Sequence, residues 1–161
     1  MTIKADLHSD FSRIENRIKV CKNLGAEADY QLTSMLNDQL CVTITGRLEQ
    51  NLKKIFTGYA SRHSGRSLER SIAKLCQQYQ NPNPDKILDL VRLFDADFAE
   101  ELKNEWDDDM SDGNQIKQMV STRITIAHQT TNNSSLTMNK IEAFFKSYKN
   151  VITKLQVHFL P

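Results

Sequence analysis

The sequence predicts an all-α protein, a compact bundle of about five to seven helices, from three observations. Apolar residues recur mostly at steps of three and four, the spacing that keeps side chains on one face of a helix. Five glycines and three prolines in 161 residues are too few for the many turns of a β-sandwich. A chain of this length buries a core without disulfides or a structural metal. We therefore expect a single helical domain over residues 1–161.

The first two helices are expected at 3–25 and 30–59. Apolar residues follow one another at steps of three and four through the first segment until Gly25, which is typical of a helix end. The second segment contains a run with strand-like propensity at 42–46. The three-and-four rhythm continues through this run without a break, so periodicity favours helix over strand.

Turn and capping residues divide the middle of the chain. The segment 61–66 is expected to be a loop that leads into a short helix at 68–79. Asn83 is placed to cap the next helix, with Pro84 at its first position, where a missing N–H costs nothing. Asp95 can cap a further short helix in the same way.

The last two helices are separated by a polar loop. A helix is expected at about 114–127, followed by a loop at 129–135. Thr137 then caps the final helix, and Leu136 and Ile141 occupy the two positions of a hydrophobic staple.

The charge balance excludes a global attraction to nucleic acid. Lys and Arg number 21 against 20 Asp and Glu, so the net charge is +1 and any RNA contact must come from a local patch. The densest local positive charge is the cluster of Arg62, His63, Arg66 and Arg70, and we single out the first three. They are candidates for RNA binding, and the alternative is a solvated turn.

The cysteines and the N-terminus indicate a cytoplasmic protein. Cys21, Cys41 and Cys76 are odd in number and far apart, as expected of buried reduced thiols. The N-terminus lacks the apolar core of a signal peptide, and no stretch approaches the roughly 18 apolar residues of a membrane span. We interpret Asp107, Asp108 and Asp109 as a solvated loop rather than a metal site.

An arginine and a histidine stand near the end of the helix expected at 114–127. Five residues turn an ideal helix by about 500°, which leaves Arg123 and His128 about 140° apart around the axis. They can converge if the last turn relaxes, or if two copies of the helix meet in a dimer. The negative end of the helix dipole favours a protonated His128. The alternative interpretation is an exposed capping pair.

The two side-chain types suit metal-free RNA cleavage. A guanidinium grips phosphate through two hydrogen bonds, and an imidazole transfers protons near neutral pH. A base removes the proton of a 2′-hydroxyl, which attacks the adjacent phosphorus, while a cation stabilises the charge that builds on the phosphoryl oxygens.

Four stretches resemble the HEPN superfamily, and more closely its RiboL-PSP-HEPN branch of compact helical bundles. The resemblance covers about residues 40–155. The stretches are GRLEQNLKKIFTGYA at 46–60, NPNPDKILDLVRLFD at 81–95, VSTRITIAH at 120–128 and SSLTMNKIEAFFKSY at 134–148.

The resemblance implies a ribonuclease without metal or cofactor. In that family an R-x4-6-H motif is the proposed catalytic centre, which corresponds to Arg123 and His128, and dimerisation brings two motifs into one cleft. Glu49 is implied as an orienting partner of Arg123, and the alternative is an ion pair with a nearby lysine. Asn81 is expected to form a turn. Such proteins commonly act as toxins or in phage defence, so an antitoxin or an operon-encoded partner protein is implied.

Two positions depart from the family pattern. Ile124 stands where the family commonly has a polar residue after the arginine, and Gln129 stands where a glycine often follows the histidine. An isoleucine cannot hydrogen-bond a phosphate. Two further hypotheses therefore stand beside the ribonuclease: a non-catalytic HEPN module that binds RNA or a protein partner, and a nucleotide-binding subunit of a larger complex.

Overall fold

The protein is all-helical in the part of the chain that the structure describes. A computed structural model describes residues 2–26, 29–128 and 135–161, without the side chains of residues 64–67. Within this part there are six helices and no strand, in agreement with the predicted all-α bundle. They are α1 (Ile3–Gly25), α2 (Tyr30–Gln78), α3 (Pro84–Arg92), α4 (Ala96–Trp106), α5 (Asp112–His128) and α6 (Met138–Phe159).

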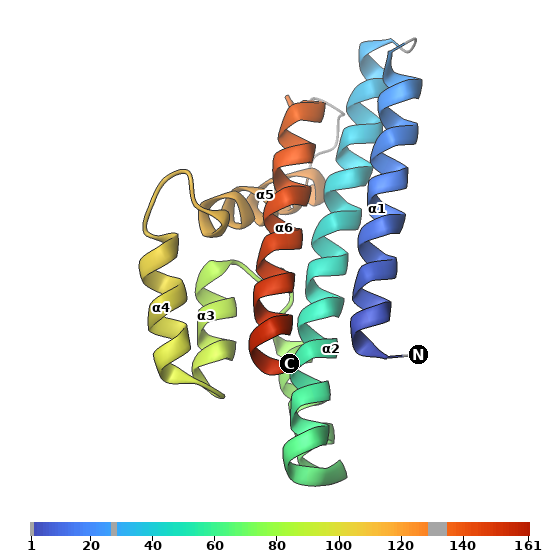
Figure 1. Cartoon of the computed structure of the whole chain (residues 1–161). Helices are drawn as coiled ribbons and strands as arrows, with labels where there is room; N and C mark the ends of the chain where they lie inside the picture. Colours follow the sequence, from blue (N-terminus) through green and yellow to red (C-terminus); the bar gives the residue numbers. More distant parts are fainter. Residues whose placement is uncertain (1, 27–28, 129–134) are drawn as a thin grey trace.

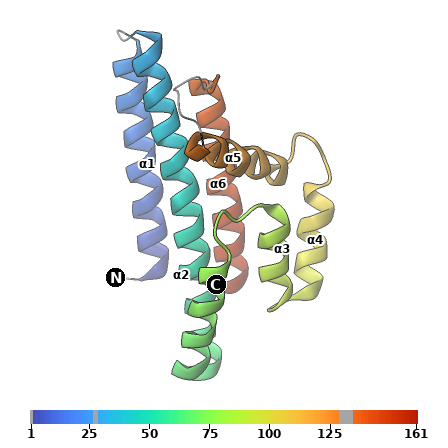
Figure 2. The same cartoon turned by 180° about the vertical axis from the view of Figure 1, so that it is seen from behind.

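Three long helices form the body of the molecule. Helices α1, α2 and α6 lie side by side, and α2 makes extensive contact with both of the others (Figure 1). Helix α5 crosses this layer on one face, as seen from behind in Figure 2, and packs against α2 and α6. The short helices α3 and α4 pair with each other beside α6. Helix α5, which carries the predicted Arg and His, therefore packs on one face of this layer.

The sequence predicts a loop at 61–66, but the structure is helical throughout this segment, which lies within α2. The chain nevertheless turns back within the residues of α2. A straight helix would separate Lys53 from Cys76 by about 34 Å. The charge of Lys53 nevertheless acts on Cys76, and Lys54 lines one pocket together with Glu69. The chain therefore turns back between these residues, and the turn projects beyond the other helices (Figure 1).

The predicted caps are confirmed. Asn83 Oδ1 accepts from Lys86 N at 3.0 Å, and Asp95 Oδ1 accepts from Phe98 N at 3.0 Å. Thr137 Oγ1 accepts from Lys140 N at 3.3 Å. Each cap satisfies a backbone N–H that has no partner within its own helix. The expected loop at 129–135 lies outside the described residues except for its last position.

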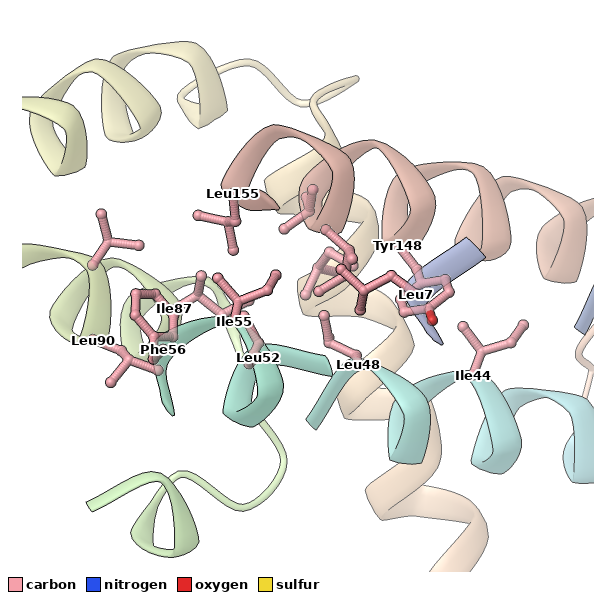
Figure 3. Close-up of a cluster of buried hydrophobic side chains, with 14 of the residues drawn as sticks. Leu7, Ile44, Leu48, Leu52, Ile55, Phe56, Ile87, Leu90, Tyr148 and Leu155 are labelled. Carbon is pink, nitrogen blue, oxygen red and sulfur yellow. The ribbon is translucent and has the colours of Figure 1, made fainter. Parts of the chain in front are cut away.

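One cluster of buried side chains draws on all six helices. Figure 3 shows its centre, where residues of α1, α2 and α3 meet Tyr148 and Leu155 of α6. Tyr148 is fully buried, and its hydroxyl accepts a 2.7 Å hydrogen bond from Asn51 Nδ2. Burial raises the pKa of Tyr148. The hydroxyl therefore stays protonated, and this polar contact fixes the register of α2 against α6.

The cysteines are free thiols. Cys41 and Cys76 are buried as expected, whereas Cys21 is only partly buried. Burial raises the pKa of the Cys76 thiol, as it does for Cys21. The charge of Arg17 opposes the rise at Cys21.

Two glycines are expected to respond to alanine in opposite directions. A Cβ on Gly113 would lie 2.6 Å from both Cβ and Cγ of Trp106, so Gly113→Ala should destabilise the protein by about 1–3 kcal/mol through overpacking. A Cβ on Gly46 meets nothing within 4 Å, so Gly46→Ala should stabilise it by about 0.5–1 kcal/mol. Urea unfolding of both variants measures the difference. Destabilisation by Gly46→Ala would contradict the open surface assigned to that position.

Candidate functional site

Helix α5 carries both residues of the predicted centre. It is assigned as α-helix up to and including His128, which is its last residue. Helical geometry therefore holds through the Arg123-to-His128 segment, and the two side chains leave the axis about 140° apart and about 7.5 Å along it. The helix does not end early enough for a relaxed last turn to bring them together. Within one chain, α5 places them on different faces.

Arg123 lies on the side of α5 that meets α2. It is partly buried, one turn beyond Met119, whose carbonyl oxygen accepts a 3.6 Å hydrogen bond from the thiol of Cys41. The pKa of Cys41 is raised to about 12, mainly by burial and also by the charge of Asp38, while a hydrogen bond with Thr45 and the charge of Arg123 act to lower it. Arg123 therefore sits next to the Cys41 turn of α2, with Asp38 in the same neighbourhood.

His128 lies on the solvent side of α5. Its stripe of the helix consists of residues at steps of four, three and four, all of them exposed: Lys117, Ser121, Ile124 and His128. Ile124 is 39% exposed and so does not serve the protein's own core. The exposed end of α5 therefore carries an apolar side chain, Ile124, one turn before an imidazole, His128.

The side chain of Glu49 hydrogen-bonds the turn at Asn81 and not Arg123, the contact that was expected. Its Oε2 accepts a 3.3 Å hydrogen bond from Asn81 N, and Asn81 has a φ of 50°, in the left-handed region. Asn81 is therefore a turn former, as predicted. No ion pair joins Glu49 to Arg123 or to a lysine in the described part of the chain. Along α2, Glu49 lies about 12 Å from the Cys41 turn.

The predicted RNA-binding cluster lies at the far end of α2. Arg62 and His63 are exposed, and Arg62 lines a shallow pocket with Lys54 and Glu69. The ring of His63 stacks on Tyr59 at 4.2 Å, and its Nδ1 donates to the Tyr59 carbonyl at 2.9 Å. The side chain of Arg66 lies outside the described residues. Arg62 is about 31 Å along α2 from Cys41, so the structure does not bring this cluster to Arg123.

His8 and His158 are at the surface. His8 is exposed on α1. His158 stacks on Phe98, and its Nε2 lies 2.9 Å from Asp95 Oδ2. The pKa of Asp95 lies below its ordinary value, first because of the hydrogen bond from Phe98 N and then because of His158. This pair ties α6 to the start of α4.

The fold brings together a group of arginines that sequence reasoning missed. Arg13 and Arg17 of α1 line one pocket with Arg47 of α2. They lie about thirty residues apart in the chain, and only the spacing of Arg13 and Arg17 by four is visible without the structure. Asp107, Asp108 and Asp109 are exposed, and the residues that the structure describes contain no group of three or more His, Cys, Asp or Glu able to hold a metal ion.

Comparison of the chain with protein-family models, with curated proteins and with solved structures finds no match. Among the described helices, none is long and apolar enough to cross a membrane.

Proposed function

We propose that this protein is a metal-independent endoribonuclease of the HEPN type, whose centre is built from Arg123 and His128 of two copies in a homodimer. The proposal is supported by the side chains at the end of α5. An exposed histidine follows an exposed isoleucine there, and the partly buried Arg123, near Cys41 of α2, lies about one and a half turns before the histidine. Covering Ile124 with a second copy would bury apolar surface and bring the partner's α5 to the same place.

In the proposed dimer, the arginine and the histidine of each centre come from different copies. Arg123 and His128 of one helix leave its axis about 140° apart, so within one chain the two side chains do not share a face of α5. A two-fold axis near Ile124 would place His128 of each copy opposite Arg123 of the other. Two such centres would lie in one cleft.

The reaction then follows from the two groups. His128 accepts the proton of the RNA 2′-hydroxyl, whose oxygen forms a bond to the adjacent phosphorus as the bond from phosphorus to the 5′-oxygen breaks. The leaving 5′-oxygen takes up a proton from water, and Arg123 stabilises the charge on the phosphoryl oxygens. The products are a 2′,3′-cyclic phosphate and a 5′-hydroxyl. Cys41 is not a nucleophile in this scheme, since its pKa of about 12 keeps it protonated.

The test is cleavage of RNA without divalent metal. Purified protein is incubated with total RNA in excess EDTA, and the product ends are analysed for cyclic phosphate. Cleavage that leaves 2′,3′-cyclic phosphate ends is the expected result. Intact RNA across structured and unstructured substrates would refute the ribonuclease.

A second function is favoured by Ile124 itself. Its exposure also fits a non-catalytic module that binds RNA or a protein partner through the same end of α5. Such a module would dimerise or bind without cutting, so the same assay separates the two functions when it is paired with an RNA-binding measurement.

A further inference from the structure

A pocket between α1 and α2 gathers three arginines and no carboxylate. It has a volume of about 220 Å³. Helix α1 contributes Arg13, Ile14, Asn16 and Arg17, and helix α2 contributes Thr43 and Arg47. Ile14 is buried, so the polar side chains surround an apolar floor.

Helical spacing creates the pocket. Arg13 and Arg17 are four residues apart on α1, and Thr43 and Arg47 are four residues apart on α2, so each pair occupies one face of its helix. The adjacent surface of α2 is open, since a Cβ on Gly46 would meet nothing within 4 Å. A ligand longer than the pocket can therefore continue along α2.

The charges around the pocket do not cancel. Asp10 is buried beneath it and lies 3.4 Å from Arg47 and 2.9 Å from Lys54, so one carboxylate faces two cations. Gln50 further fixes Arg47 through a 2.9 Å hydrogen bond. Arg13 and Arg17 are exposed and form no ion pair with any described residue. A protein of net charge +1 thus concentrates free positive charge here.

Three guanidinium groups around a small pocket fit a phosphate group. Each guanidinium matches phosphate geometry with two parallel hydrogen bonds. No aromatic side chain lines the pocket, so it offers no stacking surface for a base. A volume of about 220 Å³ is sufficient for a phosphate group. A phosphate of a polynucleotide backbone can occupy it while the rest of the chain lies outside.

We propose that Arg13, Arg17 and Arg47 bind the phosphate backbone of single-stranded RNA. The choice of RNA rests on the proposed function, whereas the preference for phosphate rests on the pocket alone. The larger cleft near Trp106 is lined by four aspartates and two lysines, and so disfavours phosphate. It provides a matched control.

The experiment measures binding of a fluorescein-labelled 12-nucleotide single-stranded RNA by anisotropy in EDTA. All proteins carry His128→Ala, so that the RNA stays intact. Arg13→Gln/Arg17→Gln is compared with Lys103→Gln/Lys154→Gln, which makes the same charge change in the control cleft and on α6. The arginine pair should weaken binding about tenfold or more at low salt and reduce the slope of log K against log salt by about 1.4, against less than about twofold for the lysine pair.

Three results would overturn the inference: no RNA binding by the parent protein, equal weakening by both pairs, or stronger binding of ATP or inorganic phosphate than of RNA at the same arginines. Failure of the proposed function is a separate result. RNA binding that depends on Arg13 and Arg17 without any cleavage refutes the ribonuclease and supports this site. Cleavage by an Arg13→Gln/Arg17→Gln protein that retains full RNA affinity does the reverse.

Discussion

His128→Ala is expected to lower the rate of metal-free RNA cleavage by about 10²–10⁴-fold, the usual contribution of a general acid or base. The imidazole is the proton-transfer group of the proposed centre, and alanine offers no replacement. His128 is exposed at the end of α5, so the free energy of unfolding should change by less than about 0.5 kcal/mol. Single-turnover cleavage in EDTA gives the rate, and urea unfolding gives the stability.

The control for this variant is His8→Ala, another exposed histidine on a helix. Its cleavage rate should equal that of the parent. Cleavage by His128→Ala at the parental rate would remove the histidine from the mechanism. A fall in rate that matches a loss of folded protein would assign His128 a structural role.

Phe159→Ala is expected to destabilise the protein by about 3–5 kcal/mol, although the residue lies at the end of the last helix. Terminal residues usually tolerate change. Phe159 is only 2% exposed, and its ring lies 5.1 Å from that of Phe56 and 5.3 Å from that of Tyr59. It also meets Phe94 and Phe98 edge to face. Alanine would leave a cavity where α2, α4 and α6 meet.

Urea unfolding compares Phe159→Ala with Val157→Ala. Val157 lies on the same turn of α6 but is 62% exposed, so its loss should cost less than about 0.5 kcal/mol. Similar midpoints for the two variants would contradict the position of Phe159 in the core.

Local patterns predict most of the helices because helix starts depend on neighbours in the chain. The apolar rhythm predicts α1 at its observed bounds, and Asn83, Asp95 and Thr137 mark the starts of α3, α4 and α6. The segment at 61–66 shows the limit of this reasoning. A loop is predicted there, whereas the structure is helical and the chain turns back between Lys53 and Cys76, an outcome that the local sequence does not decide.

The candidate site is less predictable because it depends on which helices meet. Spacing places Arg123 and His128 at the end of one helix, and the structure agrees. Sequence spacing does not predict the hydrogen bond from Asn81 N to Glu49, because these residues are 32 positions apart. Arg13 and Arg47 are equally remote in sequence, and only the packing of α1 on α2 makes them neighbours.

The most direct measurement of the shared centre is complementation between two inactive variants. Arg123→Ala and His128→Ala chains with different tags are coexpressed, and the mixed dimer is purified through both tags and assayed on RNA in EDTA. If each centre takes Arg123 from one copy and His128 from the other, one of its two centres is intact and about half of the parental activity should return. A mixed dimer as inactive as either variant alone would contradict a centre built across two chains.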